Sequence, residues 1–184
     1  MPETQALATA GEVVRFWSEA GPEHWFRKDD AFDRDFRDRF LATHEAAARG
    51  ALDDWRDTAE GSLALLVLLD QFPRNAFRGS GRMYATDALA RLVAQHAAAA
   101  GHPAQVAQAL RAFFHLPFSH SEWLPDQQRA LELARDCGPE SERWARHHHD
   151  VVARFGRFPH RNDLLGRVGT AQERAFLADG GFSG

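Results

Sequence analysis

Three short segments of the chain concentrate arginine, histidine, amide and carboxylate side chains, the groups that bind anions or move protons. The richest, residues 150–162, places three arginines, a histidine and an asparagine around Phe158 and Pro159. A shorter segment of similar composition, residues 70–75, has the sequence Asp-Gln-Phe-Pro-Arg-Asn. Because the guanidinium group suits bidentate contacts with carboxylate or phosphate, we expect these segments to bind an anion. The expected ligand-binding residues are Gln71, Arg74, Asn75, Arg78, Arg154, Arg157, His160, Arg161, Asn162 and Arg167.

Candidates for proton transfer lie in the second of these segments, residues 70–75, and in a third segment, residues 115–122. Asp70 follows a run of apolar residues, so its carboxylate should be buried and should need a partner. It suits either a general base or a salt bridge with an arginine. His120 and Glu122 are predicted to form an acid–base pair, since histidine titrates near neutrality. These three are the candidate catalytic residues, and whether any reaction follows is left open.

A second interpretation needs no ligand. Arginines near helix ends often cap backbone carbonyls and pair with buried acids, here Asp70 or Glu122. A pocket, in contrast, requires the side chains of Arg74, His120, Arg157 and Arg161 to converge. The sequence alone does not distinguish an anion-binding pocket from structural salt bridges.

Several other kinds of site are excluded by spacing. His147, His148 and His149 are adjacent on a predicted helix, where neighbours point about 100° apart, so they cannot share a metal ion. The glycines of residues 79–81 lack the lysine of a phosphate-binding loop. We therefore expect no metal and no cofactor. The five tryptophans are expected to pack in the core.

Composition limits the class of protein. The 184 residues carry a net charge of −4, which provides no basic field for nucleic acid. The single cysteine, Cys137, rules out an intrachain disulfide and fits a reducing cytoplasm. The longest apolar run, residues 63–69, is far shorter than the roughly 20 residues that span a bilayer. Together with an N-terminus unlike a secretory signal, this predicts a cytoplasmic protein that contacts no membrane.

The elements that must position these residues are predicted to be helices, because apolar residues recur at three and four positions through most of the chain. Residues 62–69 are apolar on every side, which is typical of a central helix with neighbours all around. Other expected buried stripes are Phe32, Phe36 and Phe40; Tyr84, Ala88, Leu92 and His96; Val106, Leu110, Phe113 and Phe114; and Trp144, His148, Val151 and Phe155.

Several residues also predict where helices begin and end. Asp29 or Asp30 is the expected N-cap of the phenylalanine-rich helix. Gly101 and Gly156 are placed to end helices in the left-handed conformation. Thr170 and Glu173 have the spacing of a capping box at the start of the last helix.

The three segments together resemble the DUF924 family of bacterial proteins of unknown function. The likeness is carried by residues 69–79, 116–122 and 154–162, by Leu-Gly-Arg at 165–167, and by Phe-Trp at 16–17. The resemblance implies a fold similar to that of tetratricopeptide proteins. It implies no established activity, so it assigns no catalytic residue.

The prediction is therefore a single all-α domain over residues 1–184, with about eight helices packed as antiparallel hairpins in a tetratricopeptide-like superhelix or a compact bundle. Residues 1–10 are expected to be a loosely ordered extension and residues 179–184 a tail. The leading functional hypothesis is binding of an anionic small molecule such as a phosphate or carboxylate compound. The alternative is a protein-interaction module whose arginines form structural salt bridges. The sequence does not predict an oligomeric state.

Overall fold

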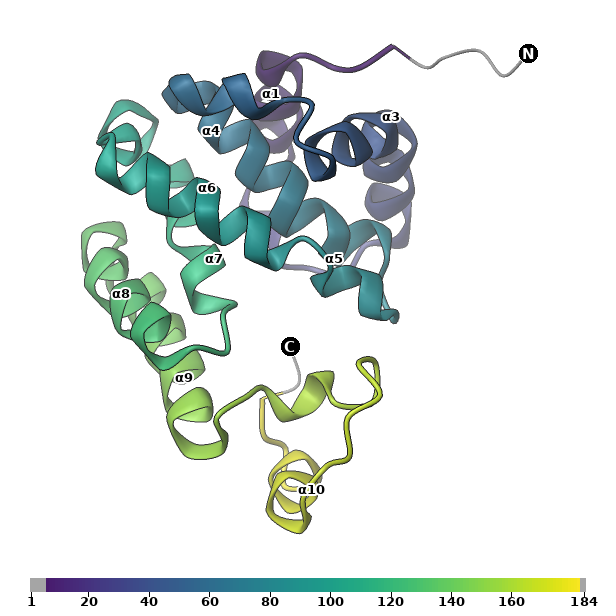
Figure 1. The fold of residues 1–184 in the computed structure, drawn as a ribbon, viewed down its shortest axis with the longest axis vertical. Coiled ribbons are helices and arrows are strands. Elements are labelled where there is room, and N and C mark those ends of the chain that lie inside the picture. Colours follow the sequence, from purple (N-terminus) through teal and green to yellow (C-terminus); the bar gives the residue numbers. More distant parts are fainter. Residues whose placement is uncertain (1–5, 183–184) are drawn as a thin grey trace.

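The computed structural model describes residues 6–182, and within that range all regular structure is helical, which confirms the predicted all-α class. Residues 1–5 and 183–184, parts of the expected extension and tail, lie outside the described residues. The α-helices are α1 (Ala10–Ala20), α2 (Pro22–Trp25), α3 (Asp30–Ala48), α4 (Ala59–Leu66), α5 (Phe72–Ala76), α6 (Asp87–Ala99), α7 (Leu116–Ser119), α8 (Leu124–Ala134), α9 (Pro139–Phe155) and α10 (Ala171–Ala178) (Figure 1). A π-helical turn, η2 (Val67–Gln71), joins α4 to α5. The 3-10 helices are η1 (Asp53–Asp57), η3 (Gly81–Tyr84), η4 (His102–Gln105), η5 (Gln108–Phe114), η6 (Arg135–Cys137) and η7 (Pro159–Arg161).

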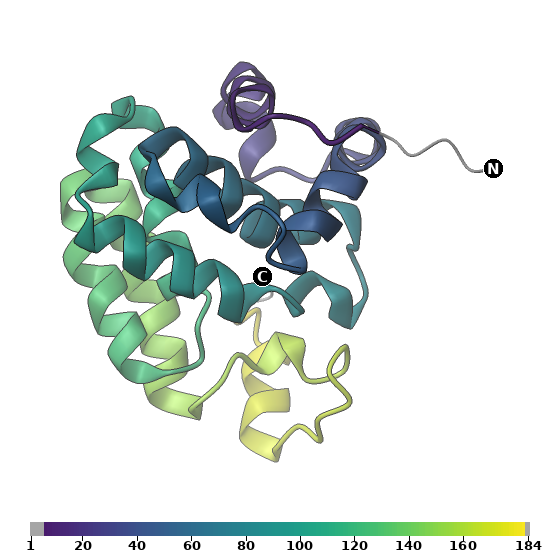
Figure 2. The ribbon, with the colours of Figure 1, turned by 45° about the horizontal axis from the view of Figure 1, so that its top comes forward.

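The helices succeed one another in space much as they do in the chain. Helix α4 packs against α1 and α6, α6 against α7, and α7 against α8. Helices α8 and α9 form a hairpin, and η7 and α10 lie together beyond the end of α9 (Figures 1 and 2). None of the helices between residues 6 and 182 is long and apolar enough to cross a membrane. The single-domain organisation and the tetratricopeptide-like superhelix stay predictions.

The core is built around α4, as its all-round apolar sequence predicts. Thr58 caps the helix by accepting a hydrogen bond from the Gly61 amide, and all residues from Gly61 to Gln71 are buried. On the α1 and α3 side of this core, Trp17 stacks on Trp25 and Phe36 stacks on Phe16. Burial of so many large apolar side chains supplies the main favourable free energy of folding.

The α-helical pattern changes at η2, and Pro73 explains why. Proline has no backbone N–H, so it cannot bond the carbonyl four residues before it, which is that of Leu69. The Phe72 amide bonds the Val67 carbonyl, five residues back. The two carbonyls left over accept side-chain donors instead: Leu68 from His44 Nδ1 at 2.9 Å and Leu69 from the Thr86 hydroxyl at 2.6 Å. The widened turn thus ties α3 and the start of α6 to the segment that carries Asp70 and Gln71.

Most predicted helix ends are confirmed. Asp29 caps α3 through the amides of residues 31 and 32. Gly101 and Gly156 both adopt the left-handed conformation, with φ of 71° and 70°. Thr170 and Glu173 form the predicted capping box of α10.

The predicted stripe on α6 is wrong. Tyr84 lies in η3, before the helix begins, and Leu92 is 47% exposed. The buried face consists of Ala90, Val93, Ala94 and Ala97. Three of these four residues are alanines, and α6 packs against α4. Small side chains at such a contact allow two helices to approach each other closely.

Two further expectations need correction. The segment holding Leu110, Phe113 and Phe114 buries these residues as predicted, but it is the 3-10 helix η5, in which residues three apart lie on the same side. Trp144 was expected in the core and is 47% exposed, because α9 turns Ala145 and Val152 inward instead. Trp123 is likewise exposed.

Candidate functional site

Asp70, at the end of η2, is the most deeply buried carboxylate of the predicted segments, with 1% of its surface exposed. Its side chain accepts hydrogen bonds from His120 Nδ1 at 2.7 Å and Gln71 Nε2 at 2.6 Å, and lies 3.2 Å from Arg74 Nη1. Burial alone would raise the pKa of Asp70, but Arg74 and His120 outweigh burial and lower it to about 2. The carboxylate is therefore ionised at neutral pH.

Two arginines from distant segments share a second carboxylate, Asp87, in the first turn of α6. Arg74 forms a bidentate pair with it, at 2.8 and 3.0 Å, while Arg161 from η7 reaches it at 3.4 Å. Arg161 also donates to the His120 carbonyl at 3.0 Å. We call Asp70, Gln71, Arg74, Asp87, His120 and Arg161 the central network. It joins η2, α5, α6, the end of α7 and η7.

Arg161 is the least compensated cation of this network. Its guanidinium lies between the rings of Tyr84 and Phe158, 4.5 and 4.6 Å from their centroids. Within the described part of the chain, its Nε is buried and has no hydrogen-bond partner. Burial and the nearby Arg74 lower the pKa of Arg161. Asp87 already has a closer partner in Arg74, so the 3.4 Å ion pair of Arg161 is the longest one in the central network.

Histidine rings extend the central network toward α9. His120 lies 5.9 Å from His148, centroid to centroid, and His148 contacts Phe158 at 5.7 Å. Burial is the main cause that lowers the pKa of each: His148 to about 3, and His160 to about 4 with the help of Arg161. Burial and Arg74 also lower the pKa of His120, although Asp70 acts to raise it. These rings are accordingly neutral at pH 7.

Next to His120, the buried face of α7 and α8 carries polar atoms without partners among residues 6–182. They are both ring nitrogens of His115, the hydroxyl of Ser119 and the side-chain carbonyl of Gln127. Burial lowers the pKa of His115 to about 4, with a further contribution from His120. The surroundings of His120 are therefore polar as well as enclosed.

A second set of ion pairs, the C-terminal network, consists of Glu122, Arg157, Asn162, Arg167 and Glu173. Arg167 forms a bidentate pair with Glu122 at 2.6 and 2.9 Å. Arg157 does the same with Glu173 at 2.6 and 2.8 Å. Asn162 bridges the pairs, accepting from Arg167 and donating to Glu173. Hydrogen bonds from Arg157, assisted by the Thr170 amide, lower the pKa of Glu173 to about 2.

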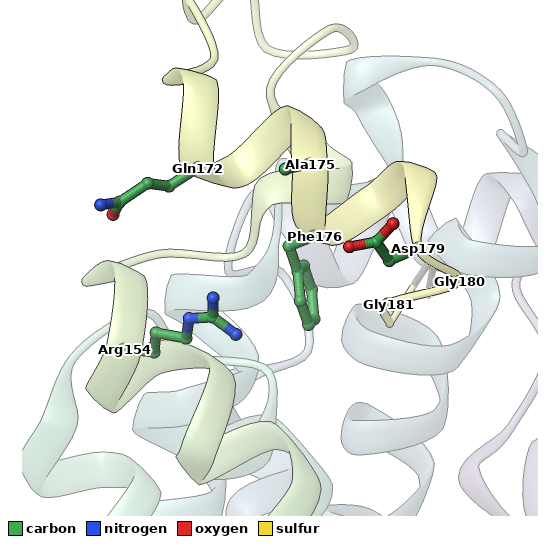
Figure 3. A pocket seen from close by; sticks show the side chains of 7 residues that line it. All are labelled: Arg154, Gln172, Ala175, Phe176, Asp179, Gly180 and Gly181. Atoms are coloured by element: carbon green, nitrogen blue, oxygen red, sulfur yellow. The ribbon is translucent and has the colours of Figure 1, made fainter.

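The remaining predicted residues lie elsewhere. Asn75 and Arg78 both bind Asp33 of α3, with Asn75 at 2.7 Å and Arg78 at 3.0 Å. Arg154 lies over the rings of Phe155 and Phe176 at an open cleft of about 560 Å³ between α9 and α10 (Figure 3).

The structure therefore brings together Arg74, His120 and Arg161, while Arg157 is held by Glu173 instead. The expected pairing of His120 with Glu122 is replaced by His120 with Asp70 and Glu122 with Arg167. His120 and Glu122 are only two residues apart, but the chain bends there and their side chains belong to different networks.

Sequence reasoning missed four residues that contact the predicted arginines: Tyr84, Asp87, Asp33 and, as an arginine partner, Glu173. Tyr84 was assigned to a buried stripe and Glu173 only to a helix cap. Asp87 and Asp33 both lie in the first turn of a helix. Acids are favoured there by the helix dipole alone, so their position in the sequence did not indicate a distant arginine partner.

Comparisons with known proteins agree with this geometry in fold and leave the chemistry unassigned. The model of the family described as "Bacterial protein of unknown function (DUF924)" matches residues 13–181. A solved structure, the protein of unknown function ATU0120 from Agrobacterium tumefaciens, is 54% identical to the chain, with a TM-score of 0.91. The match covers 92% of this chain and 97% of that one. A search of the curated proteins finds no match.

Proposed function

This chain belongs to the DUF924 family of bacterial proteins of unknown function, and from the geometry of its central network we propose that it binds a small anionic molecule, a phosphate or carboxylate compound, beside Arg161 and His120. A cytoplasmic location, which the single cysteine favours, is part of this proposal.

The observation that carries the proposal is the incomplete pairing of Arg161. A buried guanidinium without full compensation costs free energy, and a bound anion would remove that cost. The other arginines of the central and C-terminal networks have closer carboxylates: Arg74 has Asp87, Arg157 has Glu173, and Arg167 has Glu122. We infer that these three hold helix ends together, and that Arg161 is the residue that contacts the ligand.

His120 gives the same site a group that can move a proton. Because Asp70 accepts from Nδ1, the neutral ring carries its hydrogen there, and Nε2 is left as the acceptor. The lowered pKa keeps the ring neutral near pH 7, which suits a base. Asp70 acts as the positioning residue, and Gln71 and Arg74 orient Asp70. His160, whose Nδ1 is buried without a partner in the described range, is the third residue that we place at the ligand.

Thermal shift and calorimetry with inorganic phosphate and a panel of phosphorylated and carboxylated metabolites test the proposal. A ligand at 100 times its Kd should stabilise the native state by about 2.7 kcal/mol. Arg161→Gln should weaken binding at least tenfold, and Arg161→Lys, which keeps the charge, should weaken it less. Arg157→Gln is the matched control, because that side chain belongs to the C-terminal network, and it should bind as the wild type does.

Two results would count against the proposal. The first is a panel that leaves the melting temperature of the wild type unmoved, as the protein-interaction alternative expects. The second is an equal loss of affinity in the Arg161 and Arg157 variants, which would mean that the effect is one of stability rather than contact.

A further inference from the structure

The segment after α10 turns back toward the middle of the molecule (Figure 2). Gly180 has φ of 79°, in the left-handed region, and the Gly181 amide bonds the Phe176 carbonyl at 2.9 Å. A Cβ atom at Gly181 would lie 2.4 Å from that carbonyl oxygen, so only glycine allows the chain to pass there. The backbone thus places the next residue, Phe182, against α9 and η7.

Phe182 enters a space walled by aromatic rings. Its ring centroid lies 4.7 Å from His148, 5.0 Å from His147 and 5.1 Å from His160, all in edge-to-face contact, and 6.1 Å from Phe158. We call this space the aryl pocket. Edge-to-face ring pairs at these separations contribute favourable free energy in addition to that gained by burying their apolar surface.

The aryl pocket adjoins the central network through shared walls. His148 lies between Phe182 and His120, at 4.7 and 5.9 Å from their ring centroids. Phe158 contacts Phe182 on one side and the Arg161 guanidinium on the other, at 6.1 and 4.6 Å. A molecule whose ring lay where Phe182 lies would therefore be one ring away from both His120 and Arg161.

The ring of Phe182 contacts the walls of this pocket but does not match their polarity. Three of the four wall rings are imidazoles, and a phenyl ring offers them no hydrogen bond. His160 Nδ1 is buried and has no partner within residues 6–182. Phe182 itself is only partly buried, at the edge of a small cluster formed by Val151, Val152 and Phe158. Its removal should therefore leave the main core around α4 intact.

We propose that the aryl pocket is a binding subsite for a flat aromatic group, that the ring of Phe182 stands in for this group, and that the ligand is an aryl phosphate or aryl carboxylate. The anionic end of this ligand rests on the function proposed above, whereas the aryl pocket is argued from Phe182 and its walls alone. Binding requires Phe182 to leave, so the C-terminal segment competes with the ligand.

Phe182→Ala tests the competition. Phe26→Ala is the matched control, since Phe26 is 68% exposed and belongs to the α2 region. The probes are phenyl phosphate, inorganic phosphate and the neutral benzyl alcohol, titrated by calorimetry and by NMR of the histidine ring protons. Phe182→Ala should bind phenyl phosphate at least tenfold tighter than the wild type or the control, with inorganic phosphate unchanged. Benzyl alcohol should shift the His148 and His160 signals in Phe182→Ala only.

The outcomes separate the two proposals. If both phosphates bind through Arg161 but equally well with and without Phe182, the aryl pocket is refuted and the anion site stands. If neither phosphate binds while benzyl alcohol still selects Phe182→Ala, the aryl pocket stands and the anion site is refuted. Benzyl alcohol that does not distinguish Phe182→Ala from Phe26→Ala refutes the aryl pocket. Should Phe182→Ala fail to fold, Phe182→Leu keeps apolar packing without the flat ring, and the same outcomes apply.

Discussion

Asp70 and His120 lie fifty residues apart in the sequence, yet the carboxylate accepts a 2.7 Å hydrogen bond from the imidazole Nδ1 in the interior of the protein. The pairing depends on two backbone features: the π-helical turn η2, which ends at Gln71, and the short helix α7, which ends at Ser119. Each places a polar side chain at the edge of an apolar core. The central network follows from this meeting of two helix ends.

Replacing Asp70 with asparagine should lower the free energy of unfolding by about 3 to 5 kcal/mol, because it removes one partner from a buried, hydrogen-bonded set of charges. Urea unfolding followed by circular dichroism measures the change. Glu140→Gln is the control: that side chain is 81% exposed and its pair with Arg143 is at the surface, so no measurable loss is expected. Similar stabilities for the two variants would contradict the burial of an ionised Asp70.

Acidification should destabilise the protein before carboxylates begin to titrate. Burial lowers the pKa of His115 to about 4 from 6.5. Between these values the unfolded chain binds more protons than the folded one, so the free energy of unfolding falls as the pH falls. One fully shifted histidine contributes at most about 1.4 kcal/mol per pH unit. Below that range, protonation of Asp70, whose pKa is lowered to about 2, removes further stability.

His115→Leu isolates one part of this dependence. It should flatten the slope of stability against pH between about 6.5 and 4, and should leave stability at pH 7 equal or higher, because it removes two buried nitrogens that lack partners in the described chain. Unfolding in urea at several pH values checks both effects. A slope identical to that of the wild type would mean that the ring of His115 is protonated in the folded state.

Thr86→Val should lower the free energy of unfolding by about 1 to 3 kcal/mol, since it leaves the buried Leu69 carbonyl without its 2.6 Å donor. Valine matches threonine in shape, so little packing changes. Thr86→Ser keeps the hydroxyl and should be clearly more stable than Thr86→Val. If valine is tolerated as well as serine, the carbonyl freed by Pro73 has another partner.

Gly61→Ala should destabilise by about 3 kcal/mol, because the new methyl group would lie 2.1 Å from the Trp55 carbonyl oxygen at the junction of η1 and α4. Gly11→Ala, in α1, meets only the Glu60 side chain at 3.6 Å and should stabilise by up to about 1 kcal/mol. Thermal unfolding of the two variants gives opposite shifts. A neutral Gly61→Ala would require the η1–α4 junction to move.

The sequence by itself determined the helical class, the central position of α4 and most of the helix ends. These depend on local rules: apolar period, the φ freedom of Gly101 and Gly156, and the capping oxygens of Asp29 and Thr170. It also located the three polar segments. It misjudged the buried face of α6, because closeness of approach between helices depends on both partners, and periodicity describes only one.

Only the tertiary structure decided which charges meet. Coulombic pairing depends on distances of a few ångströms between segments that are tens of residues apart, and nothing in local spacing encodes them. Arg74 and Arg161 compete for Asp87, whereas Arg157 and Arg167 have acids of their own. The same is true of Phe182, which the sequence assigned to a tail and the fold places among three histidines.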